Sequence, residues 1–206
     1  MFMTAATLRA LRPTVAAPML GATDEMEEAA TNLACFDLRL QHALERAWAP
    51  GLASAKAIGQ LALECIGELG VAAAPRPDER ELNEQQFLAA LALVAVRLID
   101  ADRLAPAEKI FTWLAEQTRD PRCFNALWAL SLGSRIDETR REALLEGIDG
   151  FGDDESESLL HALAEAARSP QRGRAACERV LVSCVGEDVR EAAATMMKAI
   201  CAGEGV

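Results

Sequence analysis

From Asp24 onward, apolar residues recur at every third or fourth position, which is the spacing of an amphipathic α-helix. The pattern breaks where prolines and glycines stop a helix. No segment between turns alternates between apolar and polar positions, so the pattern predicts no β-strand. The predicted helices span residues 25–48, 52–69, 83–99, 105–117, 122–132, 138–148, 155–167, 171–185 and 188–202.

The first 23 residues have a different composition. They carry Arg9 and Arg12 but no acidic residue, and they are rich in Ala, Thr and Pro. Pro13 and Pro18 would break a long amphipathic helix, which argues against the mitochondrial presequence that the charge pattern would otherwise fit. We therefore expect residues 1–23 to form a flexible tail.

A second break lies at Pro75 and Pro77. Proline removes a backbone donor and pushes the preceding residue toward an extended conformation, so a helix cannot continue through this segment. We expect an N-terminal helical hairpin at 24–74 and a larger helical array at 81–206. A linker this short would let both parts share one core.

The segment 83–99 is apolar on nearly every side of its predicted helix. From Phe87 to Ile99, Arg97 is the only charged residue. A helix without a polar face must be covered on several sides, either by its own chain or by a partner. We therefore expect this segment to be covered either within the fold or by a partner protein.

Composition supports a helical fold. Hydrophobic residues make up 51% of the 206 residues, aromatic residues make up 4%, and there is no Tyr. The apolar content comes mainly from Ala and Leu, which are the strongest helix formers. We predict an all-α fold, an array of antiparallel helical hairpins with about eight or nine helices in the manner of an α-solenoid.

Charge and cysteine usage narrow the choice of partners and compartment. The 32 acidic and 21 basic side chains give a net charge of −11, which argues against nucleic acid or an anionic lipid surface as the main partner. Basic residues gather locally at 168–179, where we expect a solvated patch rather than an anion site.

No apolar stretch approaches the length of a membrane span. The six cysteines form no C-x-x-C pair, and Cys177 and Cys184 fit small core positions, which is typical of reduced thiols in a cytoplasmic protein.

The residues that could carry chemistry are few. The chain has two histidines and no phosphate-binding loop or nucleophile elbow, so we expect no catalytic residue, no metal ligand and no cofactor. One alternative remains open. Glu157, His161 and Glu165 are spaced four apart on one helix face and could form part of a metal-carrying bundle or an enzyme, although the Glu-x-x-His spacing of di-iron bundles is absent.

The middle of the chain contains a repeat-like pattern in which small and large residues meet where two helices would cross. The residues are Leu91, Val94, Ala95 and Leu98 in a first helix and Ala107, Phe111 and Leu114 in a second. This order, and the phrase ADRLAPAEKIFTWL at 101–114, resembles a tetratricopeptide repeat. A degenerate second unit has Leu127, Leu130, Ser131 and Ala143 in matching places, with Gly147 where an aromatic residue is expected. Small acidic proteins of this kind are similar to the chaperones and accessory proteins of bacterial type III secretion, which hold a secreted subunit soluble before export.

The favoured function is a non-catalytic protein-binding adaptor or chaperone. The tetratricopeptide-like register places six residues on a concave apolar groove that would accept an amphipathic helix or an extended segment. They are Ala92, Val96, Ile99, Asn125, Trp128 and Leu132. Two other interpretations stay open: these side chains could be covered by the N-terminal helices of the same chain, and the protein could be a structural subunit that associates with its own copies.

Overall fold

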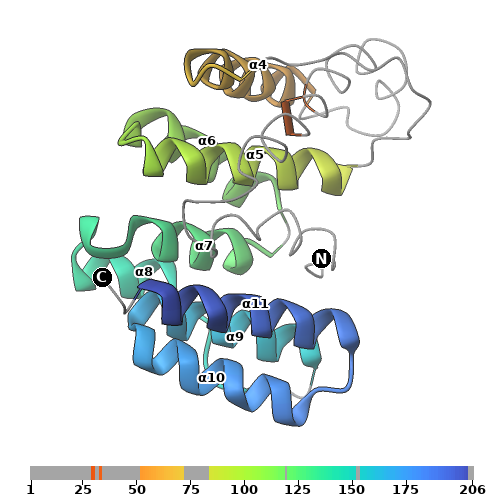
Figure 1. Ribbon diagram of the computed structural model, residues 1–206. Helices are drawn as coiled ribbons and strands as arrows, with labels where there is room; N and C mark the ends of the chain where they lie inside the picture. The colour runs from red at the N-terminus through yellow and green to blue at the C-terminus, as the bar shows by residue number, and fades with distance from the viewer. Residues whose placement is uncertain are drawn as a thin grey trace. The chain divides into compact units, whose positions relative to one another are not determined.

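A computed structural model describes residues 29, 30, 33, 52–71, 84–118, 120–151 and 154–203 (Figure 1). Every regular element in these ranges is helical, which confirms the all-α prediction for them. The elements are α4 (Leu52–Glu68), α5 (Glu84–Asp100), α6 (Leu104–Gln117), α7 (Arg122–Leu132), the 3-10 turn η2 (Gly133–Arg135), α8 (Glu138–Leu144), α9 (Glu155–Arg168), α10 (Pro170–Ser183) and α11 (Glu187–Gly203).

The chain divides into two compact units, one ending at Gln117 and the other beginning at Thr118. The predicted tail at 1–23 and the break at Pro75 and Pro77 lie outside the described residues. So does the predicted helix 25–48, apart from three helical residues at 29, 30 and 33.

Two predicted helices are shorter than their apolar pattern indicated. Helix α8 ends at Leu144 instead of 148, because Leu145 leaves the helical conformation and Gly147 has a φ of +77°. Ile148 is nevertheless 3% exposed, so a buried turn residue was mistaken for a helical core position. Helix α10 ends at Ser183 instead of 185, because Cys184 is extended and its backbone turns the chain toward α11.

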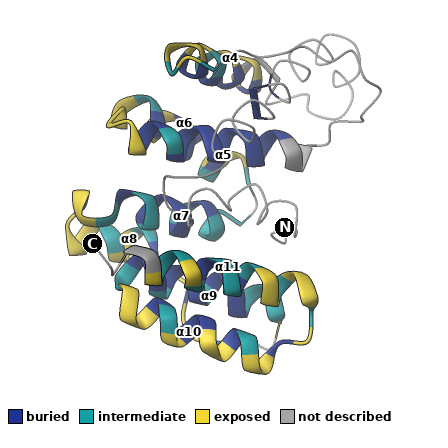
Figure 2. Cartoon of the chain, in the orientation of Figure 1, coloured by how far each residue is buried: buried dark blue, intermediate teal, exposed yellow. Residues whose placement is uncertain are grey.

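In the unit that ends at Gln117, α5 packs against α6, and α4 contacts both. Every side chain of α5 from residue 87 to 99 is buried except that of Arg97 (Figure 2). On α6, which packs against α5, Ala107 is 1% exposed and Phe111 is fully buried. The ring of Phe87 meets that of Trp113 edge to face, with centroids 6.1 Å apart. The predicted apolar helix is therefore a core helix of this unit.

The link between α5 and α6 is short. Asp102 has a φ of +60°, and the backbone N–H of Arg103 donates to the carbonyl of Leu98 at 2.7 Å. A residue in the left-handed conformation, followed by a hydrogen bond from the next N–H back to a carbonyl of the last turn, is a common way to end a helix. Glycine is the residue that most often adopts this left-handed conformation. The link lets α6 start four residues after α5 ends.

In the unit that begins at Thr118, α9 is the central helix. It contacts α7, α10 and α11, and α10 and α11 also contact each other (Figure 1). Ser169 alone joins α9 to α10: it ends α9, and its hydroxyl accepts from the backbone N–H of Arg172 at 3.3 Å. Pro170 follows at the first helical position, where its missing N–H costs nothing.

Gly173 sets how closely α9 and α10 approach. A Cβ atom at this position would lie 2.5 Å from the Cα and 2.7 Å from the Cβ of Ala166. Both distances are far below van der Waals contact, so only glycine fits here without moving a helix. The buried side chains of α9, α10 and α11 include Leu159, Ala162, Leu163, Cys177, Val180, Ala193 and Met196.

Candidate functional site

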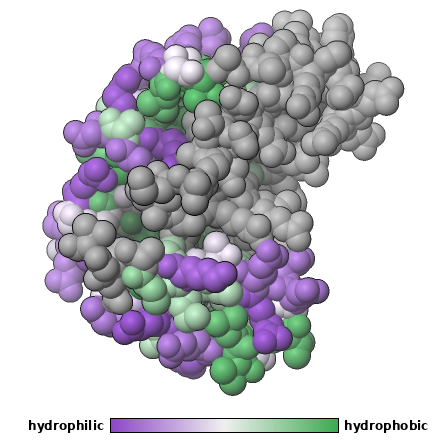
Figure 3. Space-filling model, viewed as in Figure 1, coloured by the Kyte–Doolittle hydropathy of each residue, from purple (hydrophilic) through white to green (hydrophobic). Residues whose placement is uncertain are grey.

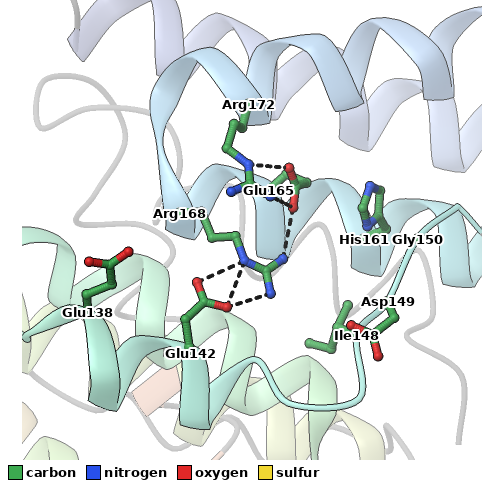
Figure 4. A pocket seen from close by; sticks show the side chains of 9 residues that line it. All are labelled: Glu138, Glu142, Ile148, Asp149, Gly150, His161, Glu165, Arg168 and Arg172. Atoms are coloured by element: carbon green, nitrogen blue, oxygen red, sulfur yellow. Dashed lines mark hydrogen bonds and ion pairs between the residues drawn. The ribbon is translucent and has the colours of Figure 1, made fainter.

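A polar pocket of about 490 Å³ opens on the unit that begins at Thr118. Helix α8, the turn that follows it, α9 and the start of α10 supply its walls (Figure 4). The lining residues are Glu138, Glu142, Ile148, Asp149, Gly150, His161, Glu165, Arg168 and Arg172. Ile148 is the only large apolar side chain among them.

A chain of ion pairs crosses the pocket. The guanidinium of Arg168 donates to both carboxylate oxygens of Glu142, with Nη2 to Oε2 at 2.9 Å, and its Nη1 donates to Oε1 of Glu165 at 2.8 Å. Arg172 binds the same Glu165 through Nε to Oε2 at 2.7 Å and Nη2 to Oε1 at 2.9 Å. Two acidic and two basic side chains thus alternate from α8 through α9 to α10 (Figure 4).

These contacts hold the network in its charged form. The hydrogen bond from Arg168 lowers the pKa of Glu142. Burial by itself would raise the pKa of Glu165, but the hydrogen bonds from Arg172 and Arg168 outweigh it and leave that pKa below its usual value. Charge-assisted hydrogen bonds to a carboxylate favour its ionised form. Both glutamates are therefore ionised at neutral pH. Two arginines of the basic patch at 168–179, Arg168 and Arg172, form ion pairs with these glutamates.

His161 lies on α9 in the pocket wall beside Gly150 (Figure 4). Its ring meets that of Phe151 at a centroid distance of 5.9 Å and an angle of 75°, and the guanidinium of Arg179 lies over the Phe151 ring at 4.4 Å. The Nδ1 atom is buried and has no hydrogen-bond partner among the described residues. Burial lowers the pKa of His161, so the imidazole is neutral at neutral pH.

The neighbouring carboxylates of α9 are also occupied. Arg122 donates from Nη2 to Oε1 of Glu157 at 2.8 Å and to Oδ2 of Asp120 at 2.7 Å. The hydrogen bond from Arg122 lowers the pKa of Asp120. At the start of α9, the carboxylate of Glu155 accepts from the backbone N–H groups of residues 185 and 186, which fixes the link between α10 and α11.

The two carboxylates of the metal-site alternative lie beside arginines. Of its three residues, Glu157 is bound to Arg122, and Glu165 is bound to Arg168 and Arg172. Within the described ranges, no three His, Cys, Asp or Glu side chains gather as metal ligands would. The two carboxylates therefore act as partners of arginines in this structure.

The six residues predicted for a partner-binding groove fall three in each unit. On α5, Ala92 and Ile99 are fully buried and Val96 is 2% exposed. On α7, Trp128 is 8% exposed, Leu132 is 6% exposed and Asn125 is half-buried. Such low exposure is what the other interpretation, burial by the chain itself, requires. The groove stays a prediction.

Cys177 and Cys184 are buried, as small core residues would be. Burial raises the pKa of the Cys177 thiol to about 12 and also raises that of Cys184. A thiolate is the reactive form of cysteine, so both side chains are poorly suited to redox exchange at neutral pH.

The described surface is mostly hydrophilic on the face drawn in Figure 3, with hydrophobic side chains near the link between α10 and α11. Val182 and Val185 in this region are 88% and 90% exposed. No described helix is both long enough and apolar enough to cross a membrane. No protein family, curated protein or solved structure matches the chain.

Replacing Arg168 with methionine is expected to lower the free energy of unfolding by about 2 kcal/mol. This value lies between the contribution of an exposed ion pair and the cost of removing one partner from a buried ion pair. The side chains of Arg168 and Glu165 are 14% and 12% exposed, but that of Glu142 is 47% exposed, and Arg172 remains to pair with Glu165. Urea denaturation at pH 7 measures the loss.

Arg190→Met is the matched control, because Arg190 is exposed on α11 and lines no part of the pocket. If Arg168→Met and Arg190→Met had the same free energy of unfolding at pH 7, the ion pairs of Arg168 would not stabilise the protein. The pKa values of Glu142 and Glu165 are lowered by folding, so the contribution is present above their unfolded pKa and is lost as the pH falls through their folded pKa. The difference between Arg168→Met and the native protein should therefore shrink in acid.

Proposed function

We propose that this chain is a non-catalytic, protein-binding adaptor or chaperone built as an array of antiparallel helical hairpins. The short links support this arrangement: three residues join α5 to α6, Ser169 alone joins α9 to α10, and residues 184–186 join α10 to α11. The small residue Ala107 and the aromatic Phe111 are both buried in α6, which contacts α5, as in tetratricopeptide-like packing.

The observation that carries the functional proposal is the charge pairing in the pocket. Its two arginines bind two of its glutamates, and its lining contains no hydroxyl, thiol or amine. Glu138 and Asp149 also line the pocket, and both are exposed. Such a surface suits recognition of polar groups on a partner rather than activation of a bond.

The partner that we propose is another protein, presented as an amphipathic helix or an extended segment. The resemblance to type III secretion chaperones would make that partner a secreted subunit, held in the cytoplasm before export. In this proposal the charged pocket orients polar side chains of that segment. Self-association remains a second candidate, and a mass measurement in solution distinguishes the two.

The test is co-purification of the tagged full-length protein from its native host, followed by chemical cross-linking. Glu138→Gln combined with Asp149→Asn is expected to reduce recovery of the partner while leaving the fold intact, because both residues are exposed. The control combines Glu146→Gln with Glu187→Gln, one acid in the same turn and one in the first turn of α11, neither lining the pocket. Equal recovery with both double variants, or a protein that binds only its own copies, would refute the proposal.

A further inference from the structure

One wall of the pocket is a turn rather than a helix. Ile148, Asp149 and Gly150 form it, and Gly147 and Gly150 on either side of Asp149 have positive φ values of +77° and +86°. Such glycines allow the backbone to adopt and leave this conformation at low steric cost. What holds the wall in place must therefore come from its side-chain contacts.

Few described contacts tie this turn to the helices. Ile148 is buried at 3% exposure, and the carbonyl of Gly147 accepts a long hydrogen bond of 3.4 Å from Arg122. At the far end of the turn, Phe151 contacts the imidazole of His161 on α9 and the guanidinium of Arg179 on α10. These contacts attach the end of the turn to α9 and α10.

Burial of the His161 ring disfavours its charged form, although groups of both signs surround it. The charged groups that face it are Glu165 and Arg168 on α9, Arg172 and Arg179 on α10, Glu138 and Glu142 across the pocket on α8, and Asp149 in the turn. Glu165, the acid whose charge raises the pKa of His161, already binds two arginines. A proton on the buried Nδ1 would find no acceptor among the described residues.

We propose that His161 is a pH-sensitive latch: its neutral ring holds Phe151 and the turn at 147–151 against α9, and its protonation releases this wall of the pocket. Release would remove Ile148, Asp149 and Gly150 from the binding surface that the proposed function assigns to the pocket. The consequence for partner binding rests on that function. The latch itself does not.

The direction follows from the two states of the histidine. In the closed arrangement burial lowers the pKa of His161, whereas in an open turn the solvated ring has its ordinary pKa of about 6.5. Well above pH 6.5 the ring is neutral in both states, so protonation contributes nothing to opening. As the pH falls below 6.5 the open state takes up the proton first, so acid favours opening, by at most about tenfold in the equilibrium constant at pH 5.5.

The full-length protein allows a direct test, because it contains two histidines. Nuclear magnetic resonance titration of the imidazole signals, with His161→Gln to assign them, should give a midpoint for His161 below 6.5. Arg179→Gln removes one of the charges that lower it and should move the midpoint upward. A native midpoint at or above 6.5 would overturn the proposal.

Hydrogen–deuterium exchange of the segment 147–151 then reports opening of the turn. After correction for the intrinsic pH dependence of exchange, the native protein should exchange severalfold faster at pH 5.5 than at pH 7.5, while segments in the centre of α9 stay protected. In His161→Leu, which is neutral at both pH values, the increase should be lost. An undiminished increase in His161→Leu would refute the latch, and because no partner is needed, this outcome is independent of the co-purification result.

Discussion

Gly173→Ala is expected to lower the free energy of unfolding of the unit that contains α9 and α10 by about 3 kcal/mol or more, at the upper end of the cost of overpacking. The new Cβ would lie 2.5 Å from the Cα of Ala166 and 3.0 Å from its backbone nitrogen. Backbone atoms cannot rotate away as a side chain can, so the two helices must separate and lose contacts along their whole length. Urea denaturation followed by circular dichroism measures the change.

Gly67→Ala is the matched control. Gly67 lies within α4, and a Cβ atom there would have no neighbour within 4 Å. Alanine in place of a helical glycine should stabilise by about 0.5–1 kcal/mol through helix propensity. The two substitutions should thus have opposite signs. Ala166→Gly should rescue Gly173→Ala only in part, because the Cα of residue 166 remains in the way, and full rescue would contradict the described contact.

Replacing Val96 or Trp128 with serine is expected to cost about 2–5 kcal/mol per site, because each change removes a buried apolar side chain and adds a hydroxyl in its place. Val96 is 2% exposed and Trp128 is 8% exposed. Thermal and urea unfolding of each variant measure the loss. The two residues belong to different units, so the effects should appear in separate parts of the molecule.

Val182→Ser and Val185→Ser serve as controls, since these valines are 88% and 90% exposed and their replacement should change stability by less than about 0.5 kcal/mol. If the Val96 and Trp128 variants kept native stability and lost only the partner, the open groove would be supported instead. Stability and partner capture, measured on the same variants, therefore decide between an accessible groove and a covered core.

The helices could be predicted from sequence because their start and stop signals are local. Helix α7 was predicted to the residue, since Pro121 precedes it and Gly133, with a φ of +53°, follows it. The errors at the ends of α8 and α10 arose where the apolar pattern continued past the helix. Periodicity alone cannot tell that Ile148 is buried in a turn, or that Val185 is exposed beyond a helix end.

The candidate site was less predictable. Glu165 and Arg168 are three residues apart on one helix, so their ion pair could be predicted from the sequence. Glu142 and Arg168 are 26 residues apart and on different helices, so their contact depends on how α8 and α9 pack. The role of His161 depends likewise on Phe151 and Arg179, which the fold brings together from a turn and from another helix.

The one-residue link at Ser169 also bears on how this unit folds. With Ser169 between α9 and α10, and residues 184–186 between α10 and α11, these helices can meet as soon as their own segments have formed. Closing such short loops costs little chain entropy, and local contacts are associated with fast folding. The Glu142–Arg168 ion pair closes a much longer loop, so we expect it to form after the contacts among α9, α10 and α11. The helices α9 to α11 would therefore assemble first, and the pocket would be the last part of this unit to take shape.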